Sequence, residues 1–224
     1  MGLVRMGCAA LRYGARGAAR NLVAALLLLA LPAAAAEPLR IVALGDSLTH
    51  GYGLPPEEGF VPQLEAWLRE NGAPDVTMVN AGVSGDTTAG GLARLDWSLA
   101  EGADALIVAL GGNDLLRGID PAASRANLDA ILTEADARGL PVLLSGMRAP
   151  LNYGAEFKAA FDAMYPELAE RHGALLDPFF LDGVASDRAL WQSDGLHPNA
   201  DGVAKIVERI GPLVLELAGR ARAD

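Results

Sequence analysis

The chain has 224 residues, with 28 acidic and 18 basic side chains and a formal net charge of −10 at pH 7. This acidic balance disfavours nucleic acid and anionic membranes as partners, because both bind through basic patches. Hydrophobic residues make up 51% of the sequence, which is enough to build a buried core in a domain of this length.

The first 36 residues have the order of a secretory signal peptide. Four arginines and no acidic residue precede the apolar stretch LVAALLLLAL at 22–31, and small alanines lie just before Glu37. A membrane anchor is the alternative, but this stretch of ten residues falls short of the roughly 20 that span a bilayer. We therefore predict a leader over residues 1–36 that is cleaved on export. The mature protein would be periplasmic or secreted, without a stable membrane anchor, and would form a single domain over residues 37–224.

Metal and cofactor chemistry has little support in the sequence. The single cysteine, Cys8, lies within the predicted leader, so the mature chain would lack thiol nucleophiles and thiolate metal ligands. The three histidines are well separated, and neither HExxH nor a Walker-type GK[ST] motif is present. The stretch GYGLPP at 51–56 lacks the third glycine of a dinucleotide-binding fingerprint. We expect no cofactor and no metal ion.

From residue 39 onward, short apolar runs alternate with longer amphipathic segments. The apolar runs predict five strands, at 39–44, 76–80, 104–110, 140–146 and 173–178. The amphipathic segments predict five helices, at 60–71, 88–100, 121–138, 155–172 and 199–219. The third and fourth runs are almost continuously apolar, as in strands that are buried on both faces of a parallel sheet. The alternation predicts a flavodoxin-like, three-layer α/β/α domain with a parallel five-stranded sheet.

Polar clusters follow three of these strands and precede the last helix. They are Gly45-Asp46-Ser47, NAGVSGDT at 80–87, GGND at 111–114 and SDGLHPN at 193–199. Taken singly, each has an ordinary explanation as a helix cap, a glycine-rich loop or a turn. Because ligands of open α/β sheets bind beyond the carboxyl ends of the strands, we expect the clusters to converge on one edge of the sheet.

Together these clusters contain the groups that acyl transfer requires. A serine hydroxyl is a weak nucleophile until a base removes its proton, and the base needs a carboxylate to orient it. Ser47, His197 and Asp194 supply these groups, and a spacing of three residues lets one turn present both His197 and Asp194. The tetrahedral intermediate needs donors for its oxyanion, for which we select the amides of Ser47 and Gly85 and the side chain of Asn113.

Other polar residues nearby are expected to have different roles. Asp46 adjoins Ser47 and should brace the turn by bonding local backbone amides. His50, three residues after Ser47, is a rival base, but it lacks a carboxylate at a comparable spacing. His172 is expected to be a cation at a helix end, where it interacts favourably with the helix dipole.

The four clusters, in this order, resemble the signature blocks of the SGNH hydrolases, also called the GDSL family. The blocks are GDSL (45–48), NAGVSGDT (80–87), GGND (111–114) and DGLHP (194–198), and they span nearly the whole mature chain. Within the family, SGDTTAGGLARL (84–95) and LGGNDLLRGID (110–120) are most similar to the bacterial multifunctional thioesterase I, protease I and lysophospholipase group and to related arylesterases. The resemblance implies the SGNH hydrolase fold.

The resemblance also implies roles for single residues. These are the nucleophile Ser47, the base His197 with its orienting acid Asp194, and the oxyanion donors Gly85 and Asn113. Gly82 also stands in the second block, but Gly85 belongs to the SGDT unit that matches the group as a whole. Residues 115–120 correspond to a mobile loop near the acyl pocket.

These features predict a serine esterase that hydrolyses carboxylic esters through an acyl-enzyme intermediate. We expect a monomer that acts on short to medium acyl esters, aryl esters and lysophospholipids, with thioesters as a further class. A carbohydrate O-deacetylase of the same fold is the alternative enzyme, and a non-catalytic binding module is the alternative outside enzymes. Candidate residues of an acyl or aryl pocket are Leu115, Leu116, Leu151 and Tyr153, although ordinary packing would also explain them.

Overall fold

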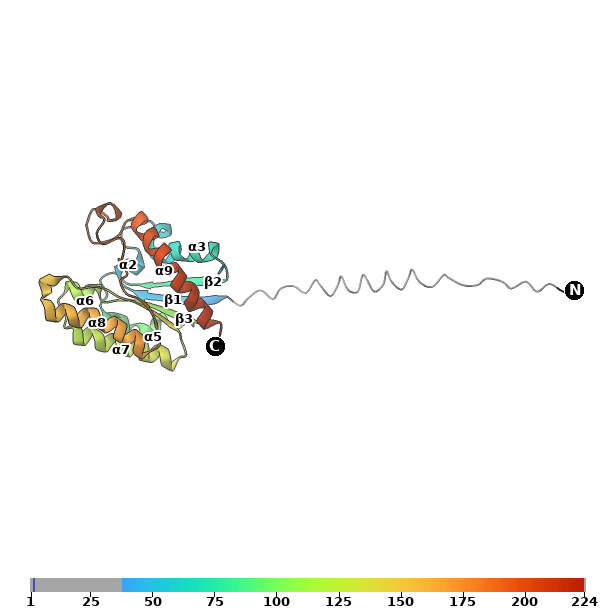
Figure 1. Ribbon diagram of the computed structural model, residues 1–224, viewed down its shortest axis with the longest axis horizontal. Coiled ribbons are helices and arrows are strands. Elements are labelled where there is room, and N and C mark those ends of the chain that lie inside the picture. Colours follow the sequence, from blue (N-terminus) through green and yellow to red (C-terminus); the bar gives the residue numbers. More distant parts are fainter. Residues whose placement is uncertain (1, 3–37, 224) are drawn as a thin grey trace. The chain divides into compact units, whose positions relative to one another are not determined.

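A parallel sheet is the centre of the fold (Figure 1). The computed structural model describes residue 2 and residues 38–223, so the predicted leader lies outside it apart from Gly2. The strands are β1 (Leu39–Gly45), β2 (Val76–Gly82), β3 (Ala105–Ala109), β4 (Val142–Ser145) and β5 (Leu175–Asp177). Their order is β2-β1-β3-β4-β5, and every pairing is parallel. The predicted α/β class and five-stranded sheet are confirmed.

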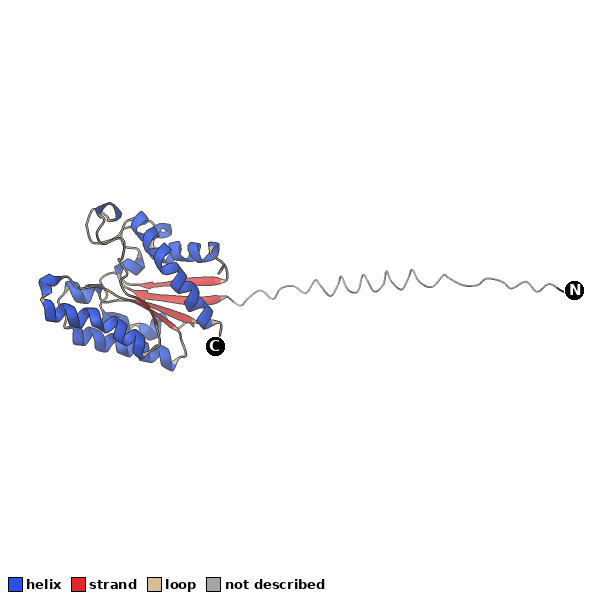
Figure 2. Ribbon diagram, in the orientation of Figure 1, coloured by secondary structure: helices blue, strands red, loops and turns tan. Residues whose placement is uncertain are grey.

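Helices cover both faces of this sheet (Figure 2). They are α2 (Ser47–His50), α3 (Phe60–Glu70), α4 (Thr88–Ala93), α5 (Leu95–Ser98), α6 (Gly112–Leu116), α7 (Pro121–Ala137), α8 (Ala155–Arg171) and α9 (Ala200–Ala221), with short 3-10 turns η1 (Pro56–Glu58), η2 (Leu151–Tyr153) and η3 (Arg188–Leu190). Helices α3 and α9 pack together on one face, and α7 and α8 pack together on the other. β3 and β4 are buried at every position, because both of their faces are covered.

Local sequence signals set where the long helices begin. Asp120 caps α7 by accepting a hydrogen bond from the backbone N–H of Ala122 at 2.9 Å, and Pro121 occupies the first helical position, as predicted. Asn199 caps α9 through the N–H of Gly202, also at 2.9 Å. The second of these caps matters for the site, because Asn199 ends the polar cluster that contains His197.

The helix predicted over 88–100 is divided into α4 and α5 at Arg94. Arg94 leaves the helical conformation, with φ −110° and ψ 7°. Its guanidinium donates to the carbonyl oxygens of Gly45 and Ala81, both at 2.8 Å, and pairs with Asp86 at 2.5 Å. The helix ends where the Arg94 side chain bonds the carboxyl ends of β1 and β2. Helix propensity depends on residues that are close in the sequence, so it does not predict this break.

The parallel register aligns the ends of the three neighbouring strands. Gly45, the last residue of β1, lies opposite Gly82 of β2 and Ala109 of β3. The segments that follow these strands therefore start from one edge of the sheet, which is where the polar clusters at 80–87 and 111–114 meet Ser47.

His172 forms the C-cap of α8 and is held by two carboxylates of α7. Its Nδ1 and Nε2 atoms lie 2.6 Å from Asp136 and 2.8 Å from Asp129. The protonated imidazole satisfies both contacts, because each ring nitrogen then donates to a carboxylate. Burial lowers the pKa of His172, but the hydrogen bonds to Asp136 and Asp129 outweigh it and hold the pKa above its usual value.

Replacing His172 with glutamine is expected to lower the free energy of unfolding by about 1 kcal/mol at mildly acidic pH. A histidine whose pKa is raised in the folded state stabilises the fold fully below its unfolded pKa of about 6.5. This contribution is lost as the pH rises through the folded pKa, so the difference between the two proteins should shrink toward alkaline pH. Urea unfolding of both proteins at about pH 5.5 and about pH 9 measures this difference in the free energy of unfolding. The same difference at both pH values would show that His172 is not the titrating group.

Candidate active site

A sharp turn after β1 places Ser47 at the first position of α2. Asp46 is the N-cap of this helix, and its Oδ1 atom accepts a hydrogen bond from the N–H of Leu48 at 3.0 Å, as expected for a residue that braces the turn. Gly45 permits the tight packing, because a Cβ at this position would lie 2.0 Å from Thr49 Oγ1. Ser47 is therefore not the helix cap, and its hydroxyl is available for another contact.

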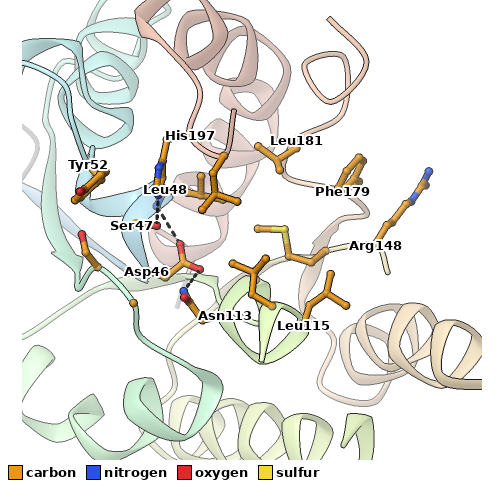
Figure 3. A pocket seen from close by; sticks show the side chains of 16 residues that line it. Asp46, Ser47, Leu48, Tyr52, Asn113, Leu115, Arg148, Phe179, Leu181 and His197 are labelled. Carbon is orange, nitrogen blue, oxygen red and sulfur yellow. Dashed lines mark hydrogen bonds between the residues drawn. The ribbon is translucent and has the colours of Figure 1, made fainter. Parts of the chain in front are cut away.

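Hydrogen bonds connect Ser47 to His197 and, through His197, to Asp194. These two residues follow Ser47 in the sequence by 150 and 147 positions. Ser47 Oγ lies 2.9 Å from His197 Nε2, and His197 Nδ1 lies 2.7 Å from Asp194 Oδ2 (Figure 3 shows the Ser47–His197 bond). An ionised carboxylate only accepts, so Nδ1 carries the proton and Nε2 accepts from the serine hydroxyl. This is the protonation state that a general base requires.

Asp194 is fixed by its own turn as well as by His197. Its Oδ1 atom accepts from the backbone N–H groups of Leu196, at 2.9 Å, and His197, at 3.0 Å. The hydrogen bond from the His197 ring, followed by these two amides, lowers the pKa of Asp194 to about 2. Asp194 is therefore a carboxylate at any pH at which the fold would normally be studied.

His50 has a different position from His197. Its side chain is exposed and its carbonyl oxygen accepts a hydrogen bond from Asn80 Nδ2 at 3.3 Å. The structure places Ser47 against His197, and the rival base selected from the sequence is not part of this hydrogen-bond chain.

The three candidate oxyanion donors lie in the wall of one cavity. The backbone N–H groups of Ser47 and Gly85 donate no hydrogen bond within residues 38–223, which leaves both available to a ligand. Gly85 has φ +82°, a left-handed conformation that favours glycine. Gly82 differs, because its N–H donates to Asn80 Oδ1 at 2.9 Å and it packs against α2.

Asp46 connects the nucleophile turn to Asn113. Its Oδ2 atom accepts a hydrogen bond from Asn113 Nδ2 at 3.1 Å (Figure 3), and the second hydrogen of that amide is left for a ligand. Burial raises the pKa of Asp46 to about 6, against the lowering effect of the bonds from Leu48 and Asn113. Sequence reasoning assigned Asp46 only a local role and missed this contact, which spans 67 residues.

The cavity beside Ser47 has a volume of about 420 Å³. Its lining residues include the polar groups already described and a larger set of apolar and aromatic side chains, namely Leu48, Tyr52, Leu115, Leu116, Met147, Phe179, Leu181 and Leu196. A mostly apolar wall with a few convergent polar groups is typical of a small-molecule site. Within residues 38–223, no group of three or more His, Cys, Asp or Glu side chains could hold a metal ion, and no helix is long and apolar enough to cross a membrane.

Of the four pocket residues selected from the sequence, two line this cavity. Leu115 and Leu116 contribute to its wall, whereas Leu151 and Tyr153 lie outside it. The η2 turn directs these two elsewhere: Leu151 is 73% exposed, and Tyr153 stacks on Phe157 with 5.0 Å between ring centroids. The selection from residue type alone was therefore wrong for half of this set.

Several lining residues were missed by sequence reasoning. Met147 and Arg148 follow β4, and Phe179 follows β5 by two residues. The rule that ligands bind beyond the carboxyl ends of the strands applies to these two strands as well, so it could have selected these residues.

Known proteins of one family resemble this chain over most of its length. A profile described as the GDSL-like Lipase/Acylhydrolase family matches residues 43–205. Esterase TesA of Pseudomonas aeruginosa is 42% identical over 185 residues, which cover 82% of this chain and 90% of that protein. Thioesterase 1/protease 1/lysophospholipase L1 of Escherichia coli (strain K12) is 39% identical over 194 residues, which cover 84% of this chain and 90% of that protein.

A solved structure gives the same result for the fold. The crystal structure of AlinE4, an SGNH-hydrolase family esterase, superposes with a TM-score of 0.69 at 47% sequence identity and covers 81% of this chain and 97% of that one. The profile match contains all four signature blocks, from GDSL to DGLHP. These matches confirm the resemblance drawn from the sequence, and the chain belongs to the GDSL-like lipase/acylhydrolase family.

Proposed function

We propose that this protein is a serine esterase that hydrolyses carboxylic esters of small molecules through an acyl-enzyme intermediate. The observation that carries the proposal is the unbroken hydrogen-bond chain from Ser47 through His197 to Asp194, in the wall of a largely apolar cavity. A nucleophile, a base and an orienting acid within hydrogen-bond reach are what acyl transfer requires. The names of the relatives, which include esterase and thioesterase, support the same activity.

In the first half of the reaction, His197 Nε2 takes the proton of Ser47 as Oγ attacks the ester carbonyl carbon. Negative charge develops on the carbonyl oxygen, where the N–H groups of Ser47 and Gly85 and the free hydrogen of Asn113 Nδ2 would stabilise it. The ester C–O bond then breaks, and His197 gives its proton to the leaving alcohol. Asp194 keeps the imidazole oriented and stabilises its charged form.

In the second half, water takes the place of the alcohol. His197 removes a proton from the water as the oxygen attacks the acyl carbon, the same donors stabilise the oxyanion, and the proton passes to Ser47 Oγ. The acid leaves and the hydrogen-bond chain is restored. Apart from the ester and water, both halves use only this chain's own side chains and backbone amides.

The cavity wall indicates the substrate class. Apolar side chains such as Leu115, Met147 and Phe179 suit the hydrocarbon part of an acyl or aryl group, and they offer few partners to sugar hydroxyls. We propose short to medium acyl esters and aryl esters as the main substrates, with lysophospholipids and thioesters as further ones. A carbohydrate O-deacetylase is less well supported, because the relatives are named for ester and thioester hydrolysis.

The test is a comparison of kcat/KM for residues 37–224 on p-nitrophenyl esters from acetyl to dodecanoyl and on acetylated sugars. We expect kcat/KM to rise by up to about fourfold for each added methylene until the cavity is filled, because each buried methylene contributes about 0.8 kcal/mol. Activity confined to acetyl groups, with acetylated sugars preferred, would support the O-deacetylase. Binding of the esters without turnover would support a non-catalytic module instead.

We also propose that residues 1–36 direct export and that residues 37–224 form the mature, monomeric, single-domain enzyme, periplasmic or secreted. The arginine-rich start, the apolar stretch and the alanines before Glu37 support this. The first strand begins at Leu39, and the residues from Pro38 form one compact unit, so the proposed cleavage site leaves the fold intact.

A further inference from the structure

One arginine that forms no ion pair among the described residues, Arg148, lines the cavity on the side opposite Ser47. Figure 3 shows Arg148 and Phe179 across the cavity from Ser47 and His197. Arg148 is exposed, and its guanidinium carbon lies 5.4 Å from the centre of the Phe179 ring. The aromatic ring supports the side chain at this position and leaves the nitrogen atoms free to donate.

Most arginines of this acidic protein are paired. In the part of the chain that the structure describes, nine of the twelve arginines form an ion pair with a carboxylate. The three others are Arg117, whose guanidinium donates to the Gly85 carbonyl oxygen at 2.7 Å, Arg148 and Arg188. Arg148 is the one of these three that lines the cavity.

The cavity wall between Ser47 and Arg148 is apolar. Figure 3 shows Leu48, Leu115 and Leu181 between these two residues, and Met147 also lines the cavity. Apart from Tyr52, the other titratable side chains in the lining are Asp46 and His197, and both are hydrogen-bonded within the reaction site. The surface therefore offers a reaction centre, an apolar path and then a cation.

We propose that Arg148 selects esters whose acyl chain ends in a carboxylate, the half-esters of dicarboxylic acids. This inference rests on the proposed esterase function. The acyl chain is the part of the substrate that stays attached to Ser47 in the intermediate, so it is the part that would occupy the cavity through both halves of the reaction. Its methylenes would lie along the apolar wall, and its terminal carboxylate would accept two parallel hydrogen bonds from the guanidinium.

The chemistry is ordinary ester hydrolysis. Water is added across the ester C–O bond, the alcohol leaves with one proton, and a dicarboxylic acid is released. The terminal carboxylate takes no part in bond breaking. Arg148 would therefore affect substrate recognition. Its effect should depend on chain length, because only an acyl chain of matching length can reach from Ser47 to the guanidinium.

The experiment compares two series of p-nitrophenyl esters with equal numbers of chain atoms, one ending in a carboxylate (from adipic to sebacic acid half-esters) and one ending in a methyl group. The quantity measured is the ratio of kcat/KM for the two series in wild type, Arg148→Gln, Arg148→Lys and Arg188→Gln. Arg188→Gln is the matched control, because it removes the same charge from an exposed arginine outside the cavity.

In wild type, the ratio should peak at one chain length. Arg148→Gln should lower that peak by about fivefold, the upper range for an exposed ion pair, and Arg148→Lys should keep part of it, since lysine retains the charge but not the paired hydrogen bonds. Arg188→Gln should leave the peak in the kcat/KM ratio unchanged, and added salt should lower this peak in wild type.

An unchanged ratio in Arg148→Gln, or an equal fall in Arg188→Gln, would overturn the inference while leaving the esterase function intact. Failure of wild type to hydrolyse either series would overturn the proposed function and this inference together.

Discussion

Replacing Ser47 with alanine is expected to lower kcat/KM for p-nitrophenyl esters by about 10⁴-fold or more. The alanine has no atom that could attack the carbonyl carbon, and His197 would have only water to activate. The residual rate would come from the oxyanion donors and from substrate binding, which the substitution leaves in place. Initial rates at several ester concentrations, with purified residues 37–224 of each protein, measure the change.

The same substitution should leave the fold almost unaffected. Asp46, not Ser47, caps α2, and the Ser47 hydroxyl bonds a side chain of the site, His197, and not the backbone. Alanine is also a good helix former at the first position of a helix. The free energy of unfolding should therefore change by less than about 0.5 kcal/mol, as should that of the exposed control variant Ser186→Ala. Equal rates in wild type and Ser47→Ala would make Ser47 an ordinary helical residue.

The layered fold could be predicted because its signals are local. The apolar run at 104–110 predicts a strand buried on both faces, and the structure has β3 at Ala105–Ala109. The pair Asp120 and Pro121 predicts where α7 begins. In each case, the residues that determine the element lie within it or next to it, and tertiary contacts agree with that preference.

Where the prediction failed, a distant residue decided the outcome. The helix over 88–100 breaks at Arg94 because the guanidinium bonds carbonyl oxygens at the ends of β1 and β2. Asn113 is held by Asp46, from another strand end. Such contacts depend on the order of the strands in the sheet. The order β2-β1-β3-β4-β5 cannot be predicted from the sequence of any single segment.

The pocket shows the same limit on a smaller scale. Leu115 and Tyr153 are both apolar or aromatic and both follow strands, yet only Leu115 lines the cavity. The direction of a side chain in a loop depends on the turn that carries it, and for Tyr153 this turn leads to Phe157. Residue type selects candidates for a pocket, and the backbone path decides among them.

The local geometry of Asp194 makes one substitution more informative than removal of the side chain. Its Oδ1 atom accepts from two backbone N–H groups, those of Leu196 and His197, and its Oδ2 atom faces His197 Nδ1. In Asp194→Asn, the amide oxygen must take the Oδ1 position, because an NH₂ group there would face two donors. The NH₂ group is then forced into the Oδ2 position, 2.7 Å from Nδ1 in the present structure.

Asp194→Asn should therefore reverse the tautomer of His197 and lower kcat by about 10⁴-fold. With the amide donating to Nδ1, the ring proton moves to Nε2, which faces the Ser47 hydroxyl and can no longer accept its proton. Asp187→Asn is the matched control, since Asp187 caps a turn through the N–H two residues ahead, as Asp194 does, and has no histidine partner. Rates on one p-nitrophenyl ester, with unfolding midpoints to show that both variants fold, give the result. The pKa of Asp194, about 2, keeps it a carboxylate in wild type at every pH of the assay, so the variant is always compared with the ionised residue. A loss below about tenfold would therefore mean that Asp194 does not set the protonation of His197.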